Sequence, residues 1–359
     1  MFNLFKKTLG FKTYLGVDIG TTSIKIVEVE GNKGSRPNLK NYGTLEGLGY
    51  LNRANDAIQT SSLKMLDTEV IALLRALLKN INTKTTDVIA SLPSFLAFTT
   101  LLDMPVIAPA EMAKAIHYQA QALVPLPSTE VTVDWITASE YIDDAGVKHQ
   151  QIFLIAVPNE VIANYKRIFS AVGLNLLALE VEGLSLARVL AADNVAPALI
   201  IDIGGRSTSI SIAANGTLRH LSQIDFAGGS LTQAIATGLN INPRRAEELK
   251  KQRGLTGTGG EYELATLMGP FLDGMISEAK RIKTEFDKNS KTSQIDRVIL
   301  SGGGANLKGI EEYFSREFQL PTAKADPTAK INFPAKIAPI AKNIGSVFTV
   351  ALGLSIREF

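Results

Sequence analysis

Cysteine is absent from the 359-residue sequence, and histidine and tryptophan are scarce, with three residues and one residue respectively. Without cysteine the chain has neither a disulfide framework nor a thiolate metal site, which fits a reducing compartment such as the cytoplasm. The histidines, His117, His149 and His220, are too scattered to predict a metal site or a catalytic triad, so we expect ordinary surface or core residues. No apolar run approaches the ~18–20 residues that cross a bilayer, and we expect no transmembrane span.

An excess of charge of either sign is also lacking, because 37 Lys and Arg nearly balance 35 Asp and Glu. This balance creates no field that attracts nucleic acid, and we expect no nucleic-acid partner. Residues 1–11 lack the apolar core and the cleavage site of a secretory signal. They fit either a loosely ordered tail or a short helix, with Phe2, Phe5 and Leu9 on one side, that binds a membrane surface or a partner.

What the sequence does contain is a repeated motif. "YLGVDIGTTSIKIVEV" at 14–29 and "ALIIDIGGRSTSISIA" at 198–213 align Asp18 with Asp202, and both acids end a β-branched run that turns through small residues. Each motif predicts a β-hairpin. The length suggests two or more domains, and the repeat divides the chain into two halves that open with the same strand, turn and strand.

The residue types in these turns suit phosphate chemistry. Consecutive backbone N–H groups in a turn of Gly, Ser and Thr bind phosphate oxygens, and small side chains leave space for the phosphate. An aspartate beside phosphate is favourable if Mg²⁺ lies between them. The alternative is a pair of ordinary hairpins. A third glycine-rich turn, residues 302–304 between a strand and a helix, favours the nucleotide hypothesis because it allows a planar ring to approach the backbone closely.

Between and after the motifs, periodicity predicts helices at about 67–80, 109–125, 159–173, 228–240, 242–254 and 261–289, the last broken at Gly269 and Pro270. Asn159 and Asn242 are expected as N-caps. Residues 130–142 and 149–158 predict a hairpin inside an inserted subdomain. Residues 323–340, rich in Pro, Ala and Lys, predict a loop before a final helix.

At this point the motifs resemble a known superfamily, that of actin, Hsp70 and the sugar kinases. More closely, the chain resembles the FtsA-like branch and, within it, the PilM family of type IV pilus assembly proteins. The resemblance implies an α/β actin-like ATPase fold, with two related ribonuclease-H-like domains around a nucleotide cleft and an FtsA-type inserted subdomain. It covers nearly the whole chain and includes "EMAKAIHYQAQALVPLPSTEVTVDW", "FAGGSLTQAIA", "AEELKKQRG", "VILSGGGANLKGIEEYF" and "ALGLSIREF".

The implied division has five parts. Residues 1–12 form an N-terminal tail or short amphipathic segment, and residues 85–159 form the inserted subdomain IC. The other subdomains are IA (13–84 and 160–194), IIA (195–225 and 295–359) and IIB (226–294).

The resemblance also implies the nucleotide-binding residues, with ATP and Mg²⁺ as cofactors. The first phosphate loop and its returning strand match Asp18, Gly20, Thr21, Thr22, Ser23 and Lys25. The second loop matches Asp202, Gly204, Gly205 and Ser207. Asp18 and Asp202 are the expected metal residues, acting through water.

Three further segments complete this implied site. Gly228 and Gly229 match the glycines before a helix near the nucleotide. Glu247 and Lys250 match a helix near the ribose and base, although an exposed charged helix face is the alternative. The adenosine loop matches Gly302, Gly303 and Gly304.

Hydrolysis is a weaker expectation than ATP binding, because it requires a group that orients water beside the metal. Glu182, in "LEVEGL", lies where the superfamily connects its domains and is the candidate catalytic residue for a weak ATPase. The alternative role is to cap the helix that follows.

The expected function is a cytoplasmic ATP-binding scaffold, peripheral at the inner face of the cytoplasmic membrane. By resemblance its partners are the N-terminal cytoplasmic peptide of PilN and other inner-membrane components of the pilus machine. The resemblance leaves open whether the chain also forms a homo-oligomer. The insert around Trp135 has no nucleotide role and is the expected peptide site, unless Trp135 is only a core residue. An FtsA-like division or secretion scaffold is the alternative, and a small-molecule kinase is a weaker one.

Overall fold

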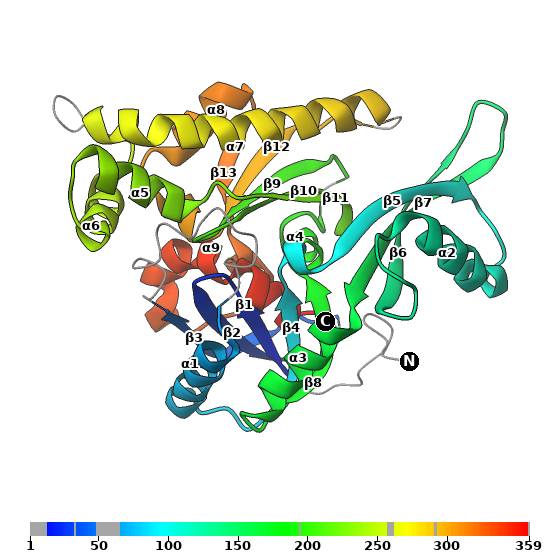
Figure 1. Ribbon diagram of the computed structural model, residues 1–359, viewed down its shortest axis with the longest axis horizontal. Coiled ribbons are helices and arrows are strands. Elements are labelled where there is room, and N and C mark those ends of the chain that lie inside the picture. The colour runs from blue at the N-terminus through cyan, green and yellow to red at the C-terminus, as the bar shows by residue number, and fades with distance from the viewer. Residues whose placement is uncertain are drawn as a thin grey trace.

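The computed structural model describes residues 13–31, 34–47, 65–193, 195–256, 262–290 and 293–357. The expectations for the first eleven residues fall outside these ranges. Within them, no helix is both long and apolar enough to cross a membrane. Two lobes and a protruding insert make up the described chain (Figure 1).

The first lobe is built on a five-stranded sheet in the order β3-β2-β1-β4-β8. β1 pairs antiparallel with β2 across the first repeated turn, and it pairs parallel with β4 on its other side. β1 is buried along its whole length, in keeping with its continuous apolar run. The strand bounds are β1 (Leu15–Ile19), β2 (Ser23–Glu30), β3 (Asn38–Glu46), β4 (Asp87–Leu92) and β8 (Asn175–Val181).

The second lobe repeats this sheet with the order β11-β10-β9-β12-β13. β9 pairs antiparallel with β10 and parallel with β12, so the second turn has the same place in its sheet as the first. The duplication expected from the sequence motif is therefore confirmed for the sheets. The strand bounds are β9 (Ala198–Ile203), β10 (Thr208–Ala214), β11 (Thr217–Ile224), β12 (Arg297–Ser301) and β13 (Thr322–Lys324).

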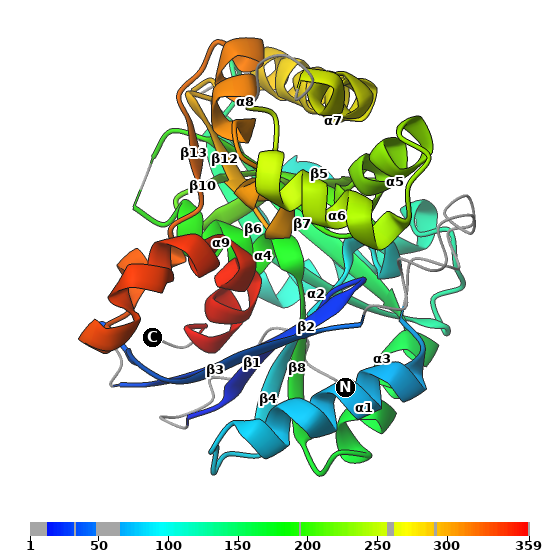
Figure 2. The same cartoon turned by 90° about the vertical axis from the view of Figure 1, so that its left-hand side faces the viewer.

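Two helices lie between the sheets. The helix α9 (Ala338–Ser355) packs on β1, β2 and β4, while α4 (Glu182–Leu190) packs on β10, β11 and α9. Figure 2 shows α1 (Asp67–Asn80) and α3 (Asn159–Ser170) on the outer side of the first lobe, with α7 (Tyr262–Asn289) and α8 (Ile310–Phe318) over the second. The remaining two helices of this lobe are α5 (Gly228–Gly238) and α6 (Pro243–Arg253).

The insert leaves the first lobe after a short 3-10 turn, Ser94–Leu96 (η4), and returns at α3. It consists of β5 (Phe98–Pro105), α2 (Pro109–Leu123), β6 (Val131–Ile142) and β7 (Lys148–Pro158), with sheet order β5-β7-β6. Its own small core includes Leu102, Ile116 and Leu154, and Trp135 packs partly buried against it. Trp135 therefore belongs to the core of the insert.

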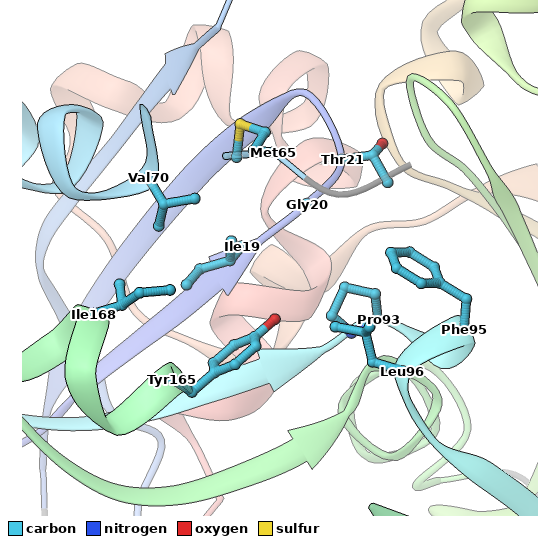
Figure 3. Close-up of a pocket in the computed structure, with 10 residues that line it drawn as sticks. All are labelled: Ile19, Gly20, Thr21, Met65, Val70, Pro93, Phe95, Leu96, Tyr165 and Ile168. Atoms are coloured by element: carbon cyan, nitrogen blue, oxygen red, sulfur yellow. The ribbon is translucent and has the colours of Figure 1, made fainter. Parts of the chain in front are cut away.

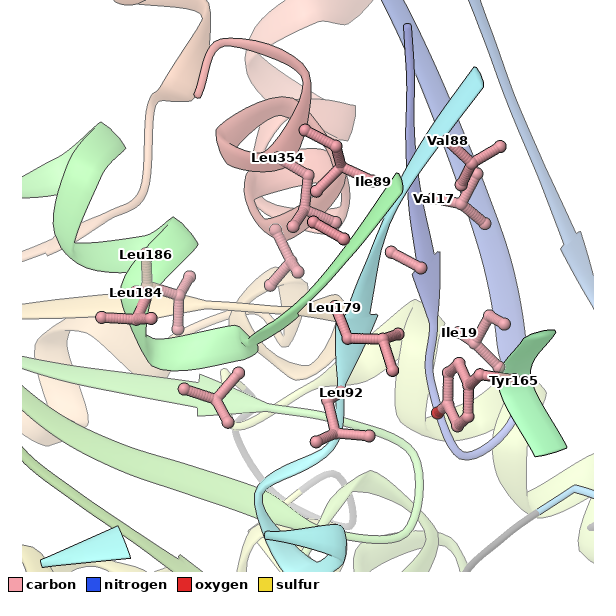
Figure 4. Close-up of a cluster of buried hydrophobic side chains, with 14 of the residues drawn as sticks. Val17, Ile19, Val88, Ile89, Leu92, Tyr165, Leu179, Leu184, Leu186 and Leu354 are labelled. Carbon is pink, nitrogen blue, oxygen red and sulfur yellow. The ribbon is translucent and has the colours of Figure 1, made fainter. Parts of the chain in front are cut away.

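The main core joins the first lobe to the helices between the sheets. Val17, Ile89, Leu179, Leu186 and Leu354 belong to this cluster and are at most 1% exposed. Figure 4 shows these side chains converging from β1, β4, β8, α4 and α9. At ~25 cal/mol per Å² of apolar surface, such burial is the main favourable term of folding. The strand ends that carry the acidic residues are thus fixed on a packed base.

Several predicted details are confirmed and two are wrong. Asn242 caps α6 by accepting a hydrogen bond from the amide of Arg244, at 2.8 Å, and Gly254 ends this helix with φ +63°. Asn159 is not a cap, because α3 has Pro158 at that position and Asn159 bonds to Thr132 instead. The helix α7 continues through Pro270, which is exposed, because buried residues on its other face keep it packed. The subdomain boundaries stay predictions.

Candidate functional site

The two repeated turns are closed by the same backbone hydrogen bond. The amide of Gly20 donates to the carbonyl of Ser23, and the amide of Gly204 donates to the carbonyl of Ser207, both at 3.0 Å. Each bond closes a tight turn directly after an acid that ends a strand. The turn sequences of small residues thus produce two equivalent hairpin tips.

These turns lie against each other. The amide of Arg206 donates to Oγ1 of Thr21 at 3.3 Å. A Cβ atom on Gly205 would lie 2.5 Å from Oγ1 of Thr22, so no larger residue fits there without a shift. The structure therefore brings the two predicted phosphate loops, including Thr21, Thr22, Gly204 and Gly205, together at the junction of the lobes.

The carboxylate of Asp18 is held on both oxygens. Lys25 donates to Oδ2 at 2.9 Å, and Ser91 donates to Oδ1 at 2.8 Å. Ser91, at the end of β4, also accepts from the amide of Ile19 at 3.0 Å. Burial by itself lowers the pKa of Lys25, but Asp18, Asp202 and Glu182 raise it above its ordinary value. Lys25 therefore stays charged among three acids.

Asp202 is the counterpart of Asp18 but has different surroundings. Burial and the charge of Asp18 raise the pKa of Asp202 to about 6, against a lowering by a hydrogen bond with Ser301 and by Lys25. Ser301 lies opposite Asp202 in the β9–β12 pairing, at the end of its strand as Ser91 is in β4. The two acids, from different lobes, are thus close enough for the charge of one to influence the other.

Glu182 is a third acid within electrostatic reach of Asp18 and Asp202. It is the first residue of α4, and the N-cap of this helix is Val181, so Glu182 is not the cap residue. Burial, with Asp18 and Asp202 next, raises the pKa of Glu182 well above its ordinary value. The strand β8 places Glu180 elsewhere, in a bidentate pair with Arg188, so only one acid of "LEVEGL" belongs to the site.

Three acids with one lysine leave an excess of buried negative charge, which suits a hard cation such as Mg²⁺. Within the described ranges, no three His, Asp or Glu side chains are close enough to form an all-protein metal site. Asp18 and Asp202 therefore fit Mg²⁺ that keeps several of its waters.

The third glycine turn packs on the end of β9. Gly302 has φ +80°, and a Cβ atom on it would lie 2.5 Å from the carbonyl oxygen of Ile203. A Cβ atom on Gly304 would lie 2.2 Å from Cγ2 of Ile203, whereas Gly303 has open space at its Cβ position. The turn thus lies beside Asp202 and leaves one face of its backbone accessible.

The remaining predicted residues lie next to the second turn. The amide of Gly228 donates to the carbonyl of Gly204 at 3.0 Å, and that of Gly229 donates to the carbonyl of Gly205 at 2.7 Å. Glu247 and Lys250 form a close ion pair on α6, with 2.7 Å between Nζ and Oε2. These four residues therefore join the same cluster.

The sequence analysis did not identify three hydroxyl residues that contact the predicted site residues: Ser91, Ser301 and Thr232. Ser91 and Ser301 both follow apolar strand residues, in "VIASLP" and "VILSGG". Aligning these strands as a further part of the repeat would have found them.

A pocket lies behind the first turn (Figure 3). It is a small cavity of about 20 Å³, and its lining includes Gly20, Thr21, Phe95 and Tyr165. Burial, with Glu182 and Asp18 next, raises the pKa of the Tyr165 hydroxyl. The pocket joins the phosphate turn to η4, the root of the insert.

Solved structures show the fold of this chain. A structure of a PilM-PilN type IV pilus biogenesis complex matches with a TM-score of 0.81 at 22% identity, covering 97% of this chain and 99% of that one. MreB 5 of Spiroplasma citri bound to AMPPNP matches with a TM-score of 0.53 at 14% identity, covering 96% and 95%. The fold is therefore the two-domain actin-like ATPase fold, as expected.

Curated relatives are cell division proteins. FtsA of Enterococcus faecalis is 23% identical over 85% of this chain and 77% of its own length. FtsA of Buchnera aphidicola is 25% identical over 42% of this chain and 43% of its own length. The matches with several FtsA proteins span less than half of those relatives.

A family model described as type IV pilus assembly protein PilM matches residues 16–359. This match covers both repeated turns, the insert and the third glycine turn. The chain therefore belongs to the PilM family of type IV pilus assembly proteins, in the FtsA-like branch of actin-like proteins.

Proposed function

We propose that the chain binds Mg-ATP between its two lobes and serves as a scaffold of the type IV pilus machine. The observation that supports nucleotide binding best is the contact between the repeated turns, with the charge of Asp18 acting on Asp202 across the lobes. The turn amides suit phosphate oxygens, and the third glycine turn suits the adenosine. Because the turns touch, they must separate slightly when a phosphate enters.

Mg²⁺, held by Asp18 and Asp202 through water, would supply neutralisation of phosphate charge. Lys25 keeps Asp18 oriented and adds a positive charge beside the phosphates. Glu182 is the group best placed to orient a water, which makes a slow ATPase part of the proposal.

The proposed partner is the N-terminal cytoplasmic peptide of PilN, docked on the insert. The strand β5 is an edge of the three-stranded sheet, which suits the addition of a peptide strand. Most of the exposed large apolar side chains of the described residues lie on the insert: Leu101, Val106, Tyr118, Leu123, Leu126, Ile142 and Val147. Through this partner the chain would lie at the cytoplasmic face of the inner membrane, with other pilus components.

Calorimetric titration with ATP, with and without Mg²⁺, tests nucleotide binding. We expect saturable binding that needs Mg²⁺ and weakens when Asp18 or Asp202 is replaced by Ala. Unchanged affinity in both variants would contradict the role of the turns. Phosphate release that requires an added sugar or carboxylate would instead favour the kinase.

Titration with a PilN N-terminal peptide tests the scaffold role. Leu101→Arg, on the exposed face of β5, should abolish micromolar binding, because it places a charge in the docking surface. Val195→Arg, at an equally apolar residue that is 77% exposed outside the insert, is the matched control. Absence of binding by the unmodified protein would favour the FtsA-like alternative.

A further inference from the structure

Among the described residues, Lys250 is the one lysine that is buried, and its ammonium group lies at the start of α5. Its residue is 9% exposed. Nζ lies 2.8 Å from the carbonyl oxygen of Gly228, 2.7 Å from Oγ1 of Thr232 and 2.7 Å from Oε2 of Glu247. A lysine ammonium has three protons, and these three acceptors use all of them. None is left to donate to a ligand.

The acceptors of Lys250 connect it to the second turn. Gly228 begins α5, and its carbonyl accepts from Lys250 while its amide donates to Gly204. The next amide, of Gly229, donates to Gly205. A Cβ atom on Gly229 would lie 2.7 Å from the oxygen of Gly205, so the two backbones are in direct contact. An unbroken chain of hydrogen bonds thus runs from α6 through α5 to the second turn.

We propose that Lys250 is a positioning residue, which holds the start of α5 and thereby fixes the amides of the second phosphate turn. This inference rests on the proposed nucleotide site and changes one part of it, because the family resemblance implies that Lys250 lies near the ribose and base.

The ion pair makes this arrangement stable. Burial lowers the pKa of Lys250, and Glu247 opposes the lowering. Burial alone would raise the pKa of Glu247, but Lys250 and the hydroxyl of Thr232 leave it below its ordinary value. Removing only one charge would leave the other buried without compensation, which destabilises proteins strongly. A test therefore needs both charges removed together.

The double variant Lys250→Met/Glu247→Gln meets this need. Lys251→Met is the matched control, since Lys251 is the next residue, contacts the same Glu247 at 3.4 Å and is exposed. Titrations with ATP, ADP and adenosine separate the two roles. If Lys250 positions the phosphate turn, the double variant should bind ATP and ADP about tenfold or more weakly and adenosine as the wild type does. Equal weakening of adenosine, or no weakening of ATP, would overturn the proposal.

Hydrogen exchange on the protein without nucleotide gives an independent measurement. We expect amides of residues 228–229 to exchange at least about tenfold faster in the double variant, with α7 unchanged and the Lys251→Met protein like wild type. Unchanged exchange at these amides would contradict the link from Lys250 to the turn. Failure of the wild type to bind ATP would reject the nucleotide site alone, because the exchange experiment does not depend on it.

Discussion

The two lobes present the same sheet and the same turn but treat their acids differently. In the first lobe the residue paired with Asp18 on the neighbouring strand is Lys25, whereas the residue paired with Asp202 in the second is Ser209. Lys25 binds Asp18 directly, while the Ser209 hydroxyl is buried without a hydrogen-bond partner in the described chain. The repeat has thus kept its backbone and changed its charge.

The consequence is electrostatic. Asp18 is paired with Lys25, so its negative charge is neutralised before any ligand binds. Asp202 has only the serine Ser301, and its pKa is raised to about 6. In the described residues neither Asp202 nor Glu182 forms an ion pair, so the three acids keep an excess of negative charge that one Mg²⁺ would neutralise.

The largest expected effect comes from removing the cation of the first lobe. Lys25→Met leaves Asp18 buried without its partner and should lower the free energy of unfolding by about 3–5 kcal/mol. Urea denaturation at pH 7 measures this loss. Lys40→Met, which breaks an exposed pair with Glu30, should cost far less, because solvent screens an exposed ion pair. Equal losses of stability in the two variants would show that the buried ion pair contributes no more than the exposed one.

In the second lobe, Asp202 should make the stability of the protein depend on pH. Because folding raises the pKa of Asp202 from 3.8 to about 6, the folded state binds more protons than the unfolded state between these values. The stability contributed by Asp202 is therefore present at pH 4 and is lost as pH rises through 6. Asp202→Asn removes this dependence.

Denaturation of Asp202→Asn and wild type at pH 4 and pH 7 measures the effect. The variant should gain about 2 kcal/mol relative to wild type at pH 7, less than the full shift gives because Asp202 is partly exposed. The matched variant Asp18→Asn should lose stability at pH 7, since it breaks the pair with Lys25. A difference between wild type and Asp202→Asn that is the same at both pH values would contradict this account.

The turns themselves differ in how tightly they close. A Cβ atom on Gly204 would lie 2.7 Å from the carbonyl oxygen of Ser207, whereas on Gly20 the nearest atoms are at 3.2 and 3.3 Å. Gly204→Ala should therefore cost about 1–3 kcal/mol and Gly20→Ala less than about 1 kcal/mol. Thermal unfolding compares them, and the reverse order would show that the second turn yields more easily than the first.

The smallest effect is expected at the register partner of Asp202. Ser209→Ala removes a buried hydroxyl that has no partner in the described residues, and it should stabilise the protein by up to about 1 kcal/mol. Ser91→Ala is the contrasting change, because it removes a donor to Asp18 and should destabilise. The midpoints of urea denaturation of the two variants measure these opposite effects. A destabilised Ser209→Ala protein would mean that the Ser209 hydroxyl has an unrecognised role.

Local patterns in the sequence predicted the hairpins, most helices and the acids at the strand ends, because β-branched runs, glycines and caps act on neighbouring residues. The parallel pairs β1–β4 and β9–β12 join segments more than 70 residues apart, so their serines, Ser91 and Ser301, leave no local signal. The unbroken α7 has the same explanation, since tertiary packing outweighs the local penalty of an exposed Pro270. The division of roles between Lys25 and Ser209 emerged only from the strand register.

The central claim is that both acids act, through one Mg²⁺, on one bound phosphate group. A double-mutant cycle of Mg-ATP affinity with Asp18→Asn, Asp202→Asn and the combined variant tests it most directly. We expect each single change to weaken binding at least about tenfold, and the combined loss to differ from the sum by about 0.5–3 kcal/mol, as for residues that share a partner. Two losses that simply add, or no loss at all, would contradict a shared site.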